Sequence, residues 1–178
     1  MTSPLLYFAY GSNLSRVQMA ARCPDASVMM PGVLGGYRLA FSGKTTKWGE
    51  GGVATILAAA EGDVPEGGVA GDGAQEGGAS EGRVLEGGVP GLLYRMTPAD
   101  VEALDRFEAV PRVYRRLEVE VAGEDGRSYP ALTYQQIGSY PNPPPMGYFL
   151  QIWRAYKEFA LEERALVAAV AHSLNHGA

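Results

Sequence analysis

Short strand-like segments constrain the fold of this chain more than any other sequence feature. Each is rich in β-branched and aromatic residues and is bounded by glycine, proline or aspartate, which is the pattern of a β-strand. Six segments show it: residues 5–9, 33–41, 52–57, 91–96, 114–121 and 129–134. A doubly wound parallel sheet would place helices of about 10–15 residues between successive strands, and these are missing from the pattern. The sequence therefore predicts an α+β fold, a small mixed β-barrel of about six strands with short flanking helices.

The flanking helices are predicted from capping and spacing. Thr97, Pro98 and Asp100 supply a hydroxyl cap, a proline at the first helical position and an acid at the third, so a helix is expected over residues 98–106. Residues 15–22 show a second helical pattern, directly after the first predicted strand.

The C-terminal tail is predicted to form two helices. Helical spacing begins at about residue 147, breaks near residues 161–162 and resumes through residue 171. Its large aromatic residues, Trp153 and Tyr156, are predicted to pack in the core and not to bind a cofactor.

A glycine-rich segment, residues 61–89, carries the negative charge of the chain. It holds one arginine and seven acidic residues, a charge of −6, so the net −5 of the chain leaves +1 for the rest. Having no aromatic residue, it cannot bury enough apolar area to offset the ordering of its glycines. We interpret it as a mobile insert within a single domain, residues 1–178. An insert without function is the favoured interpretation, and a lid or partner-binding loop is the alternative.

Composition excludes several classes of function. The nearly neutral remainder argues against nucleic-acid binding and for a small-molecule partner. Cys23 is the sole cysteine, so an internal disulfide is excluded, and a buried, inert thiol is favoured over a nucleophile. Since no apolar run approaches the ~18–20 residues of a membrane span, we expect no membrane partner. Residues 5–9 are interpreted as a buried strand and not a signal peptide, and a cytoplasmic protein is expected.

The most informative motif follows the first predicted strand and reads Tyr10, Gly11, Ser12, Asn13, Leu14. A strand that stops at such a loop and opens a helix presents backbone N–H groups, a hydroxyl and an amide, which suit a carboxylate or a developing oxyanion. From chemistry alone, a simple helix cap at Ser12 or Asn13 is the favoured alternative. A phosphate loop is excluded because the Gly-Lys-Ser/Thr sequence is absent.

Residues 5–14 closely resemble the substrate-loop signature of the gamma-glutamylcyclotransferase family, also called the avirulence-induced-gene-like family. Residues 48–56 resemble its glycine-rich entry to the next strand, and residues 104–110 resemble the segment that bears its single catalytic glutamate. Tyr134, Tyr148 and the predicted helix 148–161 also fall where the family has them. The resemblance covers nearly the whole chain outside the insert and implies the family's small mixed α/β barrel. One departure is Ala160, where a helix-ending glycine is expected.

The resemblance also implies roles. Glu108 would be the general acid and base, and the backbone N–H groups of Tyr10, Gly11, Ser12, Asn13 and Leu14 would hold the α-carboxylate and γ-carbonyl of a γ-glutamyl substrate. Tyr134 and Tyr148 would line the pocket or bond the substrate. The substrate's own α-amine would attack its γ-carbonyl, giving 5-oxoproline and a free amine without metal or cofactor. The oligomeric state, monomer or homodimer, stays open.

Three alternatives to this function are kept. The leaving group could belong to an isopeptide, or the γ-glutamyl group could protect a biosynthetic intermediate. A relative that binds small molecules without turnover is the third. Two further residue pairs are weaker: His172 and His176 have metal-compatible spacing but no evident third ligand, and Asp105 with Glu108 is a poor glycosidase pair.

Overall fold

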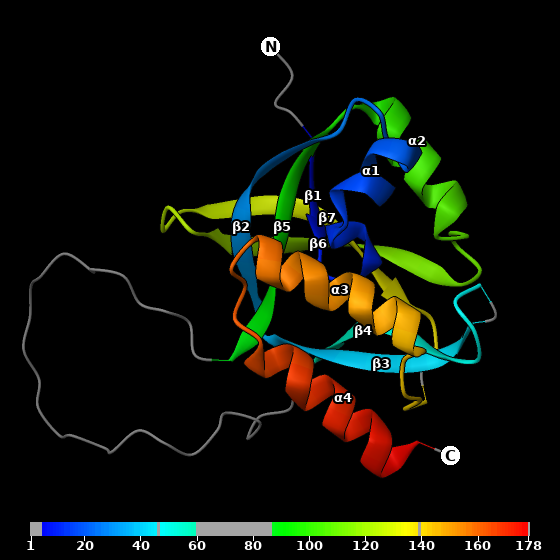
Figure 1. Ribbon diagram of the computed structural model, residues 1–178. Coiled ribbons are helices and arrows are strands. Elements are labelled where there is room, and N and C mark those ends of the chain that lie inside the picture. The colour runs from blue at the N-terminus through cyan, green and yellow to red at the C-terminus, as the bar shows by residue number, and fades with distance from the viewer. Residues whose placement is uncertain (1–4, 46, 60–86, 139, 178) are drawn as a thin grey trace, which may run out of the picture.

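The computed structural model describes residues 5–45, 47–59, 87–138 and 140–177, which fold around a closed five-stranded barrel (Figure 1). Around the barrel the strands run in the order β1 (Leu5–Ala9), β5 (Gly88–Met96), β2 (Ser27–Gly35), β6 (Tyr114–Gly123) and β7 (Ser128–Gln136). Neighbouring strands are antiparallel except β7 and β1, which close the barrel in parallel where Tyr7 pairs with Leu132. The predicted α+β barrel is confirmed.

A two-stranded antiparallel sheet of β3 (Tyr37–Thr45) and β4 (Gly51–Ala58) lies beside the barrel. The prediction of one strand over residues 33–41 was wrong, because the segment contains the end of β2, a turn and the start of β3. Gly36 makes that turn with a φ of +74°, a backbone conformation that favours glycine. In the described ranges the fold thus has seven strands, one more than predicted.

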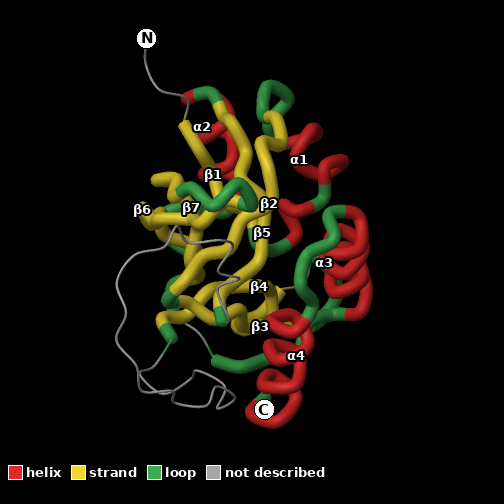
Figure 2. The backbone as a smooth tube through the Cα atoms, turned by 90° about the vertical axis from the view of Figure 1, so that its left-hand side faces the viewer, coloured by secondary structure: helices red, strands yellow, loops and turns green. Residues whose placement is uncertain are grey.

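The helices lie close to their predicted places. They are α1 (Arg16–Arg22), α2 (Pro98–Phe107), α3 (Met146–Glu158) and α4 (Arg164–His176). The capping box of α2 is present, with the side chains of Thr97 and Asp100 each bonded to the other's backbone N–H. Figure 2 shows α1, α3 and α4 on one side of the barrel, and α4 packs on β3.

The break between α3 and α4 occurs near the predicted position. Ala160 has a φ of +50°, so an alanine here adopts the left-handed conformation usual for a helix-ending glycine. Tyr156 is buried as predicted, whereas Trp153 was wrongly predicted to be core: it is 37% exposed and its ring lies under the Lys157 ammonium. Helical spacing alone does not distinguish a core position from the edge of the apolar face.

The barrel packs tightly where β1 meets its neighbours. A side chain at Gly91 of β5 would place its Cβ 2.3 Å from the Ala9 carbonyl oxygen, so only glycine fits between these strands. On the other side of β1, the buried Thr133 hydroxyl donates to the Phe8 carbonyl oxygen at 2.8 Å. These contacts fix the end of β1, from which the Gly-Ser-Asn loop leaves the barrel.

The predicted insert, residues 61–89, lies outside the described residues up to residue 86. Its last two residues, Gly88 and Val89, belong to β5, and Val89 is fully buried. The C-terminal boundary of the predicted insert was therefore wrong by two residues at least. None of the helices in the described ranges is long and apolar enough to cross a membrane.

Candidate active site

A pocket opens where β1 ends, and its wall is formed by segments far apart in the sequence. It is lined by five tyrosines, three loop residues, one alanine and one glutamate: Tyr7, Tyr10, Tyr114, Tyr134, Tyr148, Gly11, Ser12, Asn13, Ala54 and Glu108. Seven of the eight residues predicted for the site lie here. The eighth, Leu14, has its side chain in the core, and its backbone N–H donates to the Gly11 carbonyl oxygen at 3.0 Å.

Glu108 is the only carboxylate among the described residues that line the pocket. It caps the C-terminus of α2, where its N–H donates to the Leu104 carbonyl oxygen at 2.9 Å, and the next residue, Ala109, has a φ of +51°. This sharp change of chain direction follows the glutamate directly. The side chain of Glu108 is 15% exposed, so its carboxylate lies at the pocket and largely away from bulk water.

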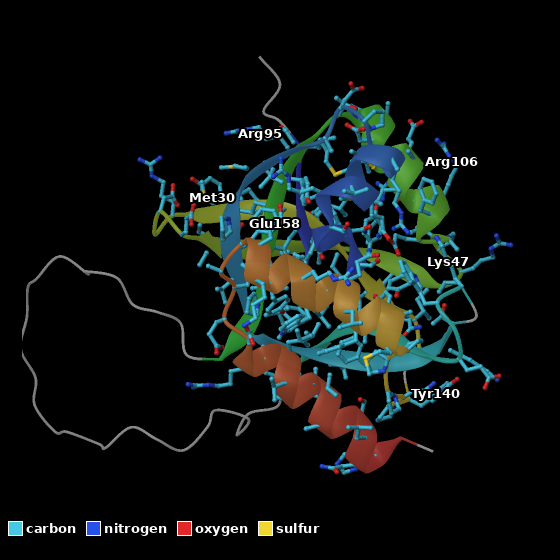
Figure 3. The ribbon with its side chains drawn as sticks, viewed as in Figure 1. Met30, Lys47, Arg95, Arg106, Tyr140 and Glu158 are labelled. Carbon is cyan, nitrogen blue, oxygen red and sulfur yellow. The ribbon has the colours of Figure 1, made fainter. Side chains whose placement is uncertain are left out.

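Burial raises the pKa of Glu108 above its usual value. A hydrogen bond from Asn13 and the positive charges of Arg22 and Lys47 act in the opposite direction. Lys47 lies on the segment between β3 and β4 (Figure 3) and is exposed, whereas the Arg22 side chain is only 10% exposed. A carboxyl group with a raised pKa is well suited to accept a proton and return it near neutral pH.

Asn13 connects the loop to Glu108. Its Nδ2 donates to the Glu108 Oε1 at 3.0 Å and to the Tyr7 hydroxyl at 2.9 Å. Its Oδ1 accepts from the Gln18 Nε2 at 3.0 Å and from the Arg22 Nη1 at 2.7 Å. Both ends of the amide are therefore bonded, which fixes the direction in which Nδ2 points.

The alternative that Ser12 or Asn13 merely caps the helix does not describe this structure. Ser15 is the N-cap of α1, and its hydroxyl accepts from the Gln18 N–H at 3.3 Å. Residues Ser12–Leu14 form a separate 3-10 turn, η1, without a side-chain cap. The Ser12 hydroxyl instead accepts from the Gln18 Nε2 at 2.9 Å. Gln18 of α1 thus holds the side chains of the loop through hydrogen bonds.

The opposite wall of the pocket is built around Ala54 in β4. Its N–H donates to the Tyr148 hydroxyl at 3.1 Å, and its carbonyl oxygen accepts from the Tyr114 hydroxyl at 3.3 Å. A Cβ on Gly11 would lie 3.0 Å from the Ala54 Cβ and 3.4 Å from the Tyr148 hydroxyl oxygen. Glycine therefore lets the loop approach β4 closely at this point.

Tyr134 lines the pocket, but its hydroxyl points elsewhere. It donates to the Asp105 Oδ1 at 2.8 Å, and the Arg116 guanidinium binds the same carboxylate with two nitrogens. These bonds connect α2 to β6 and β7 three residues before Glu108. They hold the pKa of Asp105 below its usual value, although its partial burial acts in the opposite direction. Asp105 is occupied in structural contacts, which argues against the glycosidase pair.

The tyrosines surround the carboxylate with neutral hydroxyls. Burial raises the pKa of Tyr148 to about 12 and raises that of each of the other four pocket tyrosines. They therefore serve as hydrogen-bond donors and acceptors at neutral pH and not as bases. Glu108, whose carboxyl pKa lies far below those of the tyrosines, is left as the pocket group that can act as a base.

Sequence reasoning missed several residues of this site. Tyr7 lies in β1, where strand alternation places it on the same face as Ala9, and this was a usable signal. Tyr114 begins a predicted strand, and nothing in that pattern points its side chain at Glu108. Gln18 and Arg22 lie on a predicted helix. The helical pattern alone does not distinguish them from the other polar residues of that helix.

Other candidate groups lie outside the pocket. Cys23 is buried, with its thiol 3.4 Å from the Asp100 carbonyl oxygen, and burial raises its pKa to about 11. The thiol is thus neutral and a poor nucleophile, as predicted. The rings of His172 and His176 lie 4.5 Å apart. No group of three potential metal-ligating side chains occurs in the described ranges.

Comparisons with known proteins agree with these observations. Residues 79–151 match the family model "Gamma-glutamyl cyclotransferase, AIG2-like". The chain is 29% identical over 160 residues to gamma-glutamylcyclotransferase of Bos taurus, covering 88% of this chain and 72% of the bovine protein. It is 28% identical over 151 residues to the Homo sapiens protein of the same name, covering 83% of this chain and 66% of that one.

A solved structure named gamma-glutamyl cyclotransferase superposes with a TM-score of 0.73 at 24% identity, over 95% of this chain and 88% of that one. At this identity the likeness concerns the fold. The family model and the two relatives carry the same family name as this solved structure. These likenesses support the assignment of the chain to the gamma-glutamylcyclotransferase family.

Proposed function

We propose that this protein is a gamma-glutamylcyclotransferase, which converts a γ-glutamyl amino acid or γ-glutamyl amine to 5-oxoproline and a free amine. The observation that carries the proposal is the position of Glu108. A carboxylate of raised pKa lies 3.0 Å from the Asn13 amide, at a pocket that the Gly-Ser loop also lines. This gives one proton acceptor beside a loop of polar groups suited to a carboxylate and a carbonyl.

The proposed reaction uses only proton transfer and the substrate's own amine. Glu108 takes a proton from the α-ammonium, and the freed nitrogen attacks the γ-carbonyl carbon to form a five-membered ring. The carbonyl oxygen becomes an oxyanion, for which Gly11 and Ser12 would provide the nearest backbone donors. The carbon–nitrogen bond to the leaving amine then breaks as Glu108 returns the proton to that nitrogen. The ring nitrogen, which still carries two hydrogens, gives up the second one through Glu108 to the released amine, so the products are 5-oxoproline and a protonated amine. The scheme balances without a cofactor.

The surrounding tyrosines support this scheme because they supply neutral hydroxyl groups beside Glu108. Tyr7, Tyr10 and Tyr148 are buried, and the raised pKa of each keeps its hydroxyl protonated, so Glu108 is left as the base. An attacking water would produce glutamate by hydrolysis. A pocket that holds the α-amine next to Glu108 favours ring closure, because the amine is already tethered to the carbonyl that it attacks.

A panel of γ-glutamyl compounds tests the proposal and identifies the leaving amine. It should contain γ-glutamyl amino acids, γ-glutamyl amines and a γ-glutamyl-lysine isopeptide, with 5-oxoproline as the measured product. An N-acetylated γ-glutamyl compound is the matched control, because its nitrogen can no longer attack. We expect 5-oxoproline from at least one free-amine compound and none from the acetylated one. Equal turnover of both would indicate hydrolysis. Binding of 5-oxoproline without turnover of any compound would indicate a non-catalytic relative.

A further inference from the structure

Arg22 is the last residue of α1, and its guanidinium lies behind the pocket. The Nη1 atom donates to the Asn13 Oδ1 at 2.7 Å and lies 3.5 Å from the Glu108 Oε1. Its central carbon lies 5.0 Å from the centre of the Phe107 ring, directly before Glu108 in the chain. One side chain thus contacts the loop, the glutamate and the residue that precedes it.

We propose that Arg22 is the positioning residue of this site, which holds the Asn13 amide and the Glu108 carboxylate in the arrangement that proton transfer requires. The inference rests on the proposed function, in which Glu108 exchanges the proton. Arg22 does not line the pocket and acts on the substrate only through these two neighbours.

The first part of the argument concerns the direction of the Asn13 amide. An asparagine amide can be turned by half a rotation, which exchanges its oxygen and nitrogen. Arg22 can only donate, so it requires the Oδ1 on its own side, and Nδ2 must then face Tyr7 and Glu108. The reverse orientation would place Oδ1 against the carboxylate. Gln18 also contacts Oδ1, but a glutamine side chain can itself turn and accept.

The second part concerns charge. The Nη1 contact to Glu108 is long for a hydrogen bond, so Arg22 acts on the carboxylate mainly through its positive charge. With side chains 10% and 15% exposed, the pair is screened less by solvent than a surface pair would be. The other titratable groups facing Glu108 are Lys47, the Cys23 thiol and the five pocket tyrosines. Since Lys47 is exposed, Arg22 is the better-shielded cation.

The third part concerns anchoring. The aromatic contact with Phe107 and the end of α1, where a positive charge is favoured by the helix dipole, hold the guanidinium in place. A lysine would keep the charge but has no planar group to bind Asn13 and stack on Phe107 together. The effect of the positive charge at position 22 can therefore be measured apart from the effect of the guanidinium geometry by substituting lysine for arginine.

The test compares Arg22→Met, Arg22→Lys and the control Arg16→Met. Arg16 lies on the same helix, but its guanidinium pairs with Glu158 of α3 at 3.4 Å, and neither residue lines the pocket. The titration midpoint of the Glu108 carboxyl is followed by NMR with ¹³C-labelled glutamate, assigned by loss of the signal in Glu108→Gln. The pH profiles of kcat and kcat/KM are measured in parallel.

Arg22→Met should raise the Glu108 midpoint by about one pH unit or more, because an opposite charge at this distance lowers a carboxyl pKa by that amount. The acid limb of kcat/KM should move to higher pH with it, and kcat should fall more than KM rises. Arg22→Lys should move the midpoint by less than half as much and still lower kcat. Arg16→Met should match the wild type in both readouts.

An unchanged Glu108 midpoint in Arg22→Met would overturn the inference, as would a loss confined to KM. If Arg22→Met fails to fold, Arg22→Lys decides, and wild-type kcat with a wild-type midpoint in that variant contradicts the proposal. The NMR titration needs no turnover. A wild-type protein that cyclises none of the γ-glutamyl compounds would therefore refute the proposed function while leaving the role of Arg22 testable.

Discussion

The Asn13 Nδ2 lies 3.0 Å from the Glu108 Oε1, across a separation of 95 residues in the chain. The amide comes from the loop after the first barrel strand, and the carboxylate comes from the end of α2. The barrel brings the two segments together, and this hydrogen bond connects the loop directly to the proposed general base. The predictions below test what depends on this contact.

Asn13→Ala should lower kcat/KM about tenfold or more. The variant removes a bond that lowers the pKa of Glu108, so that pKa should rise further and the acid limb should move to higher pH. Steady-state kinetics between pH 5 and 9 measure both effects. Asn142→Ala is a matched control, because that amide donates to the Gly43 carbonyl oxygen at 2.8 Å, outside the pocket. Equal losses in the two variants would mean that Asn13 matters only for folding.

Tyr134→Phe should destabilise the protein by about 1–2 kcal/mol, since it removes a hydrogen bond to the charged Asp105 carboxylate in partly buried surroundings. Chemical denaturation measures this change. Tyr129→Phe is the control: its hydroxyl donates to Asp125 at 2.6 Å on the exposed hairpin, and a smaller loss is expected there because solvent screens the contact. A smaller effect at Tyr134 than at Tyr129 would contradict a structural role for this bond.

The Asp105 carboxylate should contribute a pH-dependent part of the stability. Its folded pKa is depressed below the unfolded value, so its contribution is present above that unfolded value and is lost as pH falls through the folded pKa. Asp105→Asn should therefore lose stability at pH 7 and differ less from the wild type near pH 2–3. Urea unfolding at the two pH values measures the difference. A stability difference between Asp105→Asn and the wild type that grows as the pH falls would contradict a depressed folded pKa of Asp105.

Ala160→Gly should stabilise the protein by about 1 kcal/mol, because a left-handed φ of +50° strains alanine and not glycine. Ala169→Gly in the middle of α4 makes the same chemical change at a buried helical position and should destabilise by a similar amount. Thermal unfolding of the two variants checks the opposite signs. A loss of stability in both would show that Ala160 is not strained.

The sequence predicted much of this fold because glycines and prolines bound many of its strands and because α1 and α2 begin at side-chain caps. The capping box at Thr97 and Asp100 is a local signal, and the helix begins where that signal predicts. The turn at Gly36 was missed because strand-forming residues stand directly on both sides of it, at the end of β2 and the start of β3. Ala160 ends the helix in a left-handed conformation without the glycine that usually marks such a point, so the residue type gives no local signal for it.

The site was predicted only in part, for a different physical reason. The loop and Glu108 were identified by resemblance to a family, whereas Arg22 reaches them through the packing of α1 against α2. Tyr114 enters the pocket by the register of β6 with β7, which a single strand pattern does not specify. Contacts between distant segments are set by tertiary structure, so local sequence patterns carry little information about them.

The most direct test of the account is the kcat of Glu108→Gln with the best γ-glutamyl compound of the panel. Glutamine keeps the size and hydrogen bonding of the side chain but cannot accept and return a proton. Glu118→Gln makes the same change on the exposed face of β6 and serves as the control.

We predict that Glu108→Gln lowers kcat by about 10²–10⁴-fold or more, while folding and 5-oxoproline binding persist and Glu118→Gln retains wild-type kcat. In the wild type, activity should fall on the acid side as pH drops through the raised pKa of Glu108, because protonation removes the base. A Glu108→Gln variant with wild-type kcat and an unchanged acid limb would contradict the central claim.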